Sequence, residues 1–258
     1  TIRFGDGPTM SFWATGLRVD PDPRQDPWRF EERRLSAGEL KAALDSDFSG
    51  PGGEVIRQIL LNRGPKFGND DEVVDDIARE VADLFADAIR RHTPCRGGVY
   101  GPTTQTLTAN VPQGMAVGAT PDGRRAGEPL ADNNSPSAGT DLNGPTAAIH
   151  SVTRLDHTRF SNGTVFNLKF HPSVFSGGPE RLGQFAALIR TFFGLGGFQV
   201  QFNIVSAETL AEAKKNPEKY RNLVVKVAGY SAQFVMLDGS LQDQIIERTL
   251  HQLGGNDR

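Results

Sequence analysis

Two spacings of hydrophobic residues along the chain predict its main helices and strands. From 70 to 92 the apolar positions recur about every 3.6 residues, the pattern of an amphipathic helix. From 198 to 205 apolar and polar residues alternate, which is typical of a strand with one apolar face. The polar positions of this strand carry the amides Gln199, Gln201 and Asn203. They either line a barrel interior as hydrogen-bonding anchors or form a half-solvated face, and the sequence leaves both open.

The remaining periodic segments complete a mixed pattern. We expect further helices over 36–48, 55–61, 180–193 and 207–215, and further strands over 106–111 and 164–170. Ser36 and Glu39 have the spacing of a capping box, and Ser206 and Ser240 are expected to cap the helices that follow them. The order strand, helix, strand, helix over 164–215 favours parallel strands. One apolar stripe is predicted on the 70–92 helix, formed by Val73, Val74, Ile77, Val81, Leu84, Phe85, Ala88 and Ile89.

Gly229 interrupts the apolar run 224–237. A glycine within a strand costs backbone entropy and packs nothing, so it needs a reason to be there. One reason is a tight bend or bulge between two strands, over 224–228 and 231–237. The other is chemical: a radical on a glycine α-carbon flattens and delocalises between the amide nitrogen and the carbonyl, and a Cβ would obstruct that planarity. The residue pattern alone does not decide between the two.

Composition and charge narrow the class of protein. The chain has 258 residues, 37% of them hydrophobic, enough for a substantial core. Its formal net charge of -3 gives no general attraction to nucleic acid or to anionic membranes. We find no apolar run long enough to span a bilayer and no signal-peptide pattern, and we expect a cytoplasmic protein. A single cysteine, Cys95, excludes an internal disulfide and any cysteine-rich metal site built by this chain alone.

Two blocks of sequence carry a resemblance to a known family. The run 224–237, with 241–249 behind it, resembles the C-terminal radical loop of glycyl radical enzymes, with Lys226 where the family usually has arginine. The block 118–132 is similar to the second signature of that family. Weaker matches extend the resemblance from about Trp28 to Leu253. It favours the branch of dehydratases, carbon–nitrogen lyases and decarboxylases over pyruvate formate-lyase itself.

The resemblance implies a fold and a set of site residues. The expected fold is α/β: the later part of the second half of a ten-stranded barrel, with surrounding helices and a C-terminal radical loop. The expected divisions are a divergent segment 1–27, barrel 28–223 and glycine radical domain 224–258. The resemblance assigns the stored radical to Gly229, with a cage of Val227, Ala228 and Tyr230. It also suggests Gln105 and Leu168 as substrate contacts.

The resemblance also implies partners and an activity. The cofactor is a protein-derived glycyl radical, and no metal or other bound cofactor is expected in this chain. S-adenosylmethionine and an iron–sulfur cluster belong to a separate activating enzyme that removes hydrogen from Gly229. Family members use a thiyl cysteine on an upstream loop; Cys95 lacks that context and is expected to be a spectator thiol.

The chain starts at Thr1 and family members are several times longer, so we expect the C-terminal portion of a larger enzyme, with the thiyl cysteine on the missing N-terminal part and a homodimer at full length. This makes it the radical-bearing part of a lyase or dehydratase. The alternatives are a stand-alone radical subunit that docks onto a damaged or split partner, and a radical-free interaction module.

Overall fold

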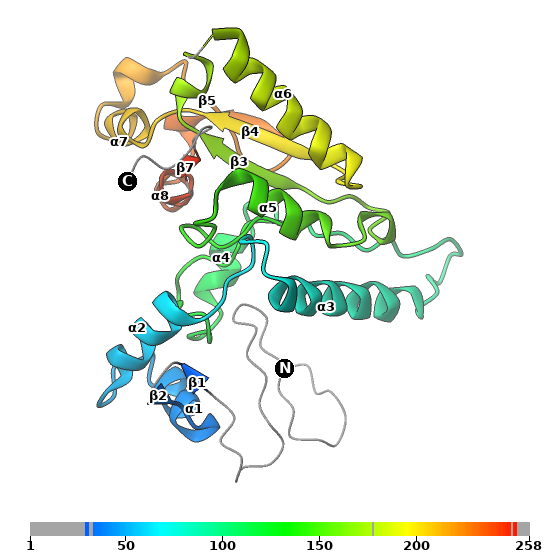
Figure 1. Cartoon of the computed structure of the whole chain (residues 1–258), viewed down its shortest axis with the longest axis vertical. Helices are drawn as coiled ribbons and strands as arrows, with labels where there is room; N and C mark the ends of the chain where they lie inside the picture. Colours follow the sequence, from blue (N-terminus) through cyan, green and yellow to red (C-terminus); the bar gives the residue numbers. More distant parts are fainter. Residues whose placement is uncertain (1–28, 31–32, 177, 249, 252–258) are drawn as a thin grey trace.

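A three-stranded parallel sheet with the order β4-β3-β7 lies in the upper part of the view in Figure 1. The computed structural model describes residues 29–30, 33–176, 178–248 and 250–251. In the sheet, β3 (Phe166–Phe170) pairs in parallel with β4 (Val200–Ile204) and with β7 (Leu250–His251). The parallel pairing predicted from the element order is confirmed. The expectation for 1–27 lies outside the described residues, and the ten-stranded barrel stays a prediction.

Helices make up most of the remaining elements. They are α1 (Ala37–Asp45), α2 (Gly53–Arg63), α3 (Glu72–Arg90), α4 (Asn110–Met115), α5 (Gly144–Thr153), α6 (Gly178–Gly194), α7 (Ala207–Lys215) and α8 (Gly239–Glu247). Two antiparallel pairs complete the strands: β1 (Arg29–Phe30) with β2 (Arg33–Arg34), and β5 (Val224–Lys226) with β6 (Ser231–Gln233). Short 3-10 turns cover His157–Arg159, Pro172–Phe175, Pro217–Tyr220 and Phe234–Met236. No helix in the described ranges is long and apolar enough to cross a membrane.

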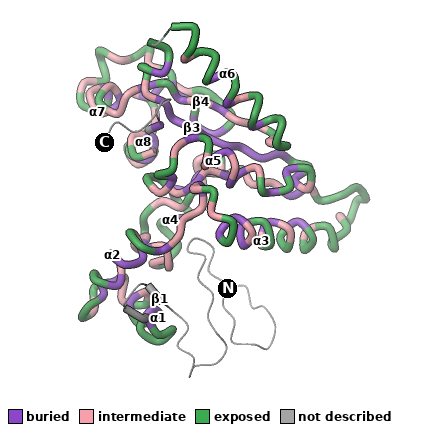
Figure 2. Tube along the Cα trace, in the orientation of Figure 1, coloured by how far each residue is buried: buried purple, intermediate pink, exposed green. Residues whose placement is uncertain are grey.

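The two faces of β3 differ in chemistry, although every residue of the strand is buried (Figure 2). Phe166, Leu168 and Phe170 join the core cluster that contains side chains of α5 and α6. Asn167 and Lys169 alternate with them and therefore face the opposite side, toward α8 and the β5–β6 hairpin. The sheet thus has an apolar face that holds it in the fold and a polar face available for specific contacts.

A separate cluster packs the C-terminal elements together. Leu210 and Ala213 of α7 meet Leu241 and Ile245 of α8, and Val225 of β5 packs with them. At the other end of the molecule α1 and α2 share their own small core, away from the sheet (Figure 1). The hairpin therefore rests on apolar packing as well as on the polar face of the sheet.

Most local expectations agree with the structure. Ser36 and Glu39 form the predicted capping box of α1, and Ser206 caps α7. Two details are wrong. The N-cap of α8 is Asp238, whose carboxylate accepts from the Ser240 N–H at 2.9 Å, because a carboxylate two residues earlier is better placed than the Ser240 hydroxyl. The predicted stripe of the 70–92 helix is only partly buried: Val73, Leu84 and Phe85 are 53%, 40% and 45% exposed.

The predicted strand over 106–111 is also wrong. Leu107 and Thr108 have φ values of 48° and 80°, which a pleated strand cannot accommodate, and α4 begins at Asn110. The Thr106 N–H donates to Asn133 Oδ1 at 2.7 Å instead of to a neighbouring strand. A contact to a distant loop therefore overrides the strand propensity of this segment.

Asp75 of α3 is expected to make the stability of the α3–α5 contact depend on pH. It is fully buried and accepts from the Ser151 hydroxyl at 3.0 Å. Burial raises the pKa of Asp75 to about 6, and the Ser151 hydrogen bond opposes the rise. The folded protein thus retains this proton after the unfolded chain has lost it. The free energy of unfolding should fall by up to about 3 kcal/mol between pH 4 and pH 6 and not return above that.

The matched variant for this prediction is Asp75→Asn, which cannot ionise. Denaturant unfolding of both proteins from pH 4 to pH 7 gives the difference between their free energies of unfolding. That difference should shift in favour of the variant as pH rises. Parallel curves for the two proteins would show that Asp75 does not carry the effect.

Candidate functional site

Gly229 lies in the turn of the β5–β6 hairpin, not within a continuous strand. The pairs Val224–Gln233 and Lys226–Ser231 frame the turn, and the Val227 N–H donates to the Tyr230 carbonyl at 2.9 Å. Gly229 has φ 80°, a backbone conformation that glycine adopts at little cost. The tight bend that we considered is therefore present. A turn that needs glycine does not exclude the chemical role, so that role stays open.

Three amide side chains from the polar face of the sheet hold this hairpin; we call Asn167, Gln201 and Asn203 the amide clamp. Gln201 Oε1 accepts from the Gly229 N–H at 3.0 Å, and its Nε2 donates to the Val227 carbonyl at 3.2 Å. Asn203 bonds both the N–H and the carbonyl of Lys226 at 2.7 Å. Gln201 and Asn203 are 7% and 5% exposed. The amides of β4 thus serve as hydrogen-bonding anchors and do not form a half-solvated face.

A buried ion pair completes the support of the hairpin. Arg248, which follows α8, lies 2.6 Å from the carboxylate of Asp132, with side chains 10% and 7% exposed. The same guanidinium donates to the carbonyls of Lys226 and Val227 at 3.3 and 3.2 Å. Burial raises the pKa of Asp132, and the Arg248 guanidinium opposes that rise. The short contact and the hydrogen bonds favour the charged forms of both residues, because the attraction between the two charges offsets the cost of removing them from water.

Lys169 fixes the end of α8 from the central strand. Its ammonium, on a residue 2% exposed, donates to the Ile246 carbonyl at 2.7 Å, near the negative end of the helix dipole. Burial lowers the pKa of Lys169 to about 8, and the nearby Arg248 charge acts in the same direction. His251 of β7 lies 2.9 Å from Asp141. These contacts hold the segment that carries Arg248.

The hairpin covers only one side of its glycine. Val227 and Ala228 are each 1% exposed, whereas Tyr230 is 43% exposed. Gly229 is itself exposed, and a Cβ built on it would have no atom within 4 Å from the described residues beyond its two chain neighbours. The described residues therefore fix the backbone from beneath and leave the α-carbon uncovered. The assignment of Val227, Ala228 and Tyr230 as a radical cage stays a prediction.

The two predicted substrate contacts lie in different environments. Gln105 is exposed, and its Nε2 would be 2.6 Å from a Cβ built on Gly163. Leu168 is 2% exposed within the core cluster behind the sheet, on the face away from the hairpin. Both assignments stay predictions, and the position of Leu168 does not support its assignment.

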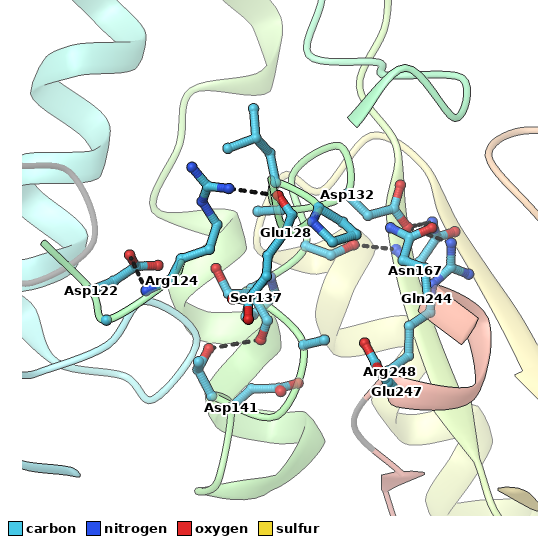
Figure 3. A pocket seen from close by; sticks show the side chains of 18 of the residues that line it. Asp122, Arg124, Glu128, Asp132, Ser137, Asp141, Asn167, Gln244, Glu247 and Arg248 are labelled. Atoms are coloured by element: carbon cyan, nitrogen blue, oxygen red, sulfur yellow. Dashed lines mark hydrogen bonds and ion pairs between the residues drawn. The ribbon is translucent and has the colours of Figure 1, made fainter. Parts of the chain in front are cut away.

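A cavity of about 350 Å³ lies beside the ion pair. Asp132, Asn167, Gln244 and Arg248 group on one side of it, and Asp122 and Arg124 lie on the other (Figure 3). Within the described ranges no group of histidine, cysteine, aspartate and glutamate side chains is arranged to hold a metal ion. Cys95 is exposed in the segment that follows α3.

Sequence reasoning missed several residues that support the hairpin. Asn167 and Lys169 carried a usable signal, since they alternate with the apolar residues Phe166, Leu168 and Phe170 in a predicted strand. Asp132 and Arg248 carried none, because only the folded chain brings these two charges together.

Comparison with known proteins agrees with this geometry. The glycine radical family model matches residues 130–235, and the pyruvate formate lyase-like model matches 29–114. A probable dehydratase of Escherichia coli, YbiW, is 43% identical over 231 residues, covering 87% of this chain and 28% of that protein. The isethionate sulfite-lyase of Desulfovibrio desulfuricans is 42% identical over 249 residues, covering 95% of this chain and 29% of that protein.

One of the solved structures contains a region with the same fold. The glycerol-bound form of the B12-independent glycerol dehydratase from Clostridium butyricum superposes with a TM-score of 0.81 at 49% identity, covering 87% of this chain and 28% of that one. Fold and sequence together thus place the chain in one family. The chain belongs to the glycyl radical enzyme family. The relatives named here are dehydratases and a lyase, and the chain spans 28–29% of their length.

Proposed function

We propose that this chain is the radical-bearing part of a glycyl radical enzyme of the lyase or dehydratase type, and that Gly229 stores the radical. The observation that carries the proposal is the held hairpin: Gly229 lies within the match to the glycine radical model, with its N–H fixed by Gln201. The other support is chemical. The position has no Cβ to obstruct a planar α-carbon, and the turn around it is fixed by buried side chains.

The proposed chemistry needs two partners. A radical S-adenosylmethionine enzyme with an iron–sulfur cluster would break the Gly229 Cα–H bond. The hydrogen atom would form a new C–H bond on the nucleoside part released from S-adenosylmethionine. The Gly229 radical would take the hydrogen atom of a cysteine S–H group, which restores the Cα–H bond and leaves a thiyl radical to act on a small polar substrate. Cys95 is exposed and outside the hairpin support, so we assign the thiol to sequence beyond these 258 residues.

The residues of this chain hold and position the glycine. The amide clamp sets the path of the backbone, and Arg248, held by Asp132, fixes the carbonyls of Lys226 and Val227. The barrel of ten strands and a homodimer at full length belong to the same proposal. A stand-alone radical subunit is not favoured, because the match to the pyruvate formate lyase-like model extends far upstream of the hairpin.

Electron paramagnetic resonance tests the proposal directly. Anaerobic incubation of the enzyme with its activating enzyme and S-adenosylmethionine should give a doublet, split by the single α-hydrogen that remains on Gly229. Protein labelled with α-deuterated glycine should give a collapsed singlet. A radical signal that keeps its splitting in the labelled protein, or no signal from a competent activating enzyme, contradicts storage on glycine.

A further inference from the structure

The Gln201 side chain makes a contact with the glycine itself. From its place on β4, its Oε1 accepts from the Gly229 N–H at 3.0 Å. The other members of the amide clamp bond to the backbone of Lys226 and Val227. Gln201 therefore differs from them in reaching the amide nitrogen on which a glycine radical depends.

The orientation of this amide is fixed by its partners. Nε2 of Gln201 donates to the Val227 carbonyl at 3.2 Å and also to Asn167 Oδ1. A rotated amide would place two N–H groups against each other at Gly229 and bring an oxygen against the Val227 and Asn167 oxygens. Because the side chain is 7% exposed, water offers little compensation for such a flip. The carbonyl oxygen is thus held toward Gly229.

We propose that Gln201 is a positioning residue that tunes the radical on Gly229, an inference that rests on the proposed function. The radical is stabilised when the amide nitrogen donates electron density into the α-carbon. An acceptor on the N–H increases the electron density at nitrogen and keeps the preceding peptide plane in place. Burial strengthens the effect, since a hydrogen bond in a low-dielectric site polarises its partners more than one in water.

Asn203 provides a matched control on the same face of the same strand. It lies two residues further along β4, is buried to a similar degree, and makes two hydrogen bonds to the same hairpin. Both of its bonds go to Lys226 and neither to Gly229. Replacement of Asn203 thus weakens the hairpin without removing the acceptor from the glycine.

The first measurement needs no radical. Hydrogen–deuterium exchange at single-residue resolution is followed for the Gly229 amide in the unactivated enzyme, with Gln201→Leu, Gln201→Glu and Asn203→Leu variants. In the Gln201→Glu variant, the protonated carboxyl group would keep an acceptor toward Gly229 and a donor toward Val227, and burial favours that form. Exchange should be about fivefold faster in Gln201→Leu, from the loss of one hydrogen bond, and near wild type in Gln201→Glu. Asn203→Leu should accelerate it less than Gln201→Leu does, because Asn203 makes no bond to Gly229. Unchanged exchange in Gln201→Leu overturns the proposal.

The second measurement is the radical itself. After activation, Gln201→Leu should give a wider α-hydrogen splitting and a half-life about fivefold shorter than wild type, whereas Asn203→Leu keeps the wild-type splitting. A doublet in Gln201→Leu with wild-type splitting and lifetime overturns the proposal. If Gln201→Leu gives no signal, the Gln201→Glu variant decides: a restored signal supports the role, and its absence refutes it.

The two levels of inference fail separately. A wild-type enzyme without any glycine-centred signal refutes the proposed function, even where the exchange result holds. A wild-type signal together with an unaffected Gln201→Leu variant refutes only the role of Gln201.

Discussion

Gly229→Ala is expected to abolish the radical while leaving the protein folded. The methyl group has no atom within 4 Å from the described residues beyond its two chain neighbours, so no clash prevents folding. The cost is in the backbone, because φ 80° is a conformation that alanine adopts with a penalty of about 1 kcal/mol. An alanine in extended strand conformation would carry no such backbone penalty. The measured result should be a modest loss of unfolding free energy and no doublet after activation.

Gly127→Ala is the matched control for this variant. Gly127 has φ 82°, is exposed, and likewise has no neighbour within 4 Å of a built Cβ. It should lose a similar amount of stability and keep the full radical signal. Radical formation in Gly229→Ala, or its loss in both variants, would contradict storage on Gly229, because the effect would then be absent or would follow backbone strain alone.

The sequence predicted the elements whose signals are local. The capping box at Ser36 and the alternation in the strand that became β4 depend on neighbours within a few positions, and both are confirmed. The strand expected over 106–111 failed because Asn133, in another loop, captures the Thr106 N–H and the chain turns through left-handed backbone conformations. Local propensity holds no information about such a contact.

The candidate site divides in the same way. Gly229 stood out because a glycine in an apolar run needs a reason, and the turn supplies a structural one. The alternating amides of β4 suggested anchors, and the structure shows that they hold the hairpin. Asp132 and Arg248 could not be paired from the sequence, because the sequence pattern does not show which charges far apart along the chain come into contact.

The polar face of the sheet explains why a short hairpin can be held in one conformation. β5 and β6 form only three residue pairs, too few for a stable isolated hairpin. Gln201, Asn203 and Arg248 supply hydrogen bonds to the backbone of Lys226, Val227 and Gly229 that a third strand would otherwise provide. These side chains thus take the place of the backbone hydrogen bonds of a third strand, and the hairpin depends on them more than on its own three residue pairs.

Arg248→Met is expected to have the largest effect on stability, about 3–5 kcal/mol, because it leaves the Asp132 carboxylate buried without its counter-charge. Lys226 and Val227 also lose their guanidinium donor. The cost should shrink as pH falls, since an unpaired buried carboxyl has a raised pKa and takes up a proton in the folded state before the unfolded chain does. Denaturant unfolding at pH 5 and pH 7 measures both effects.

Two further variants separate the buried pair from ordinary surface charge. Arg248→Met combined with Asp132→Leu removes both ions and should recover most of the loss, because no uncompensated charge remains. Arg221→Met breaks an ion pair with Glu218 whose side chains are 71% and 75% exposed, and it should cost less than about 1 kcal/mol. A double variant as unstable as Arg248→Met would mean that the hydrogen bonds to Lys226 and Val227, and not the charge pair, carry the stability of the hairpin. An Arg248→Met cost as small as that of Arg221→Met would mean that water reaches the pair in solution.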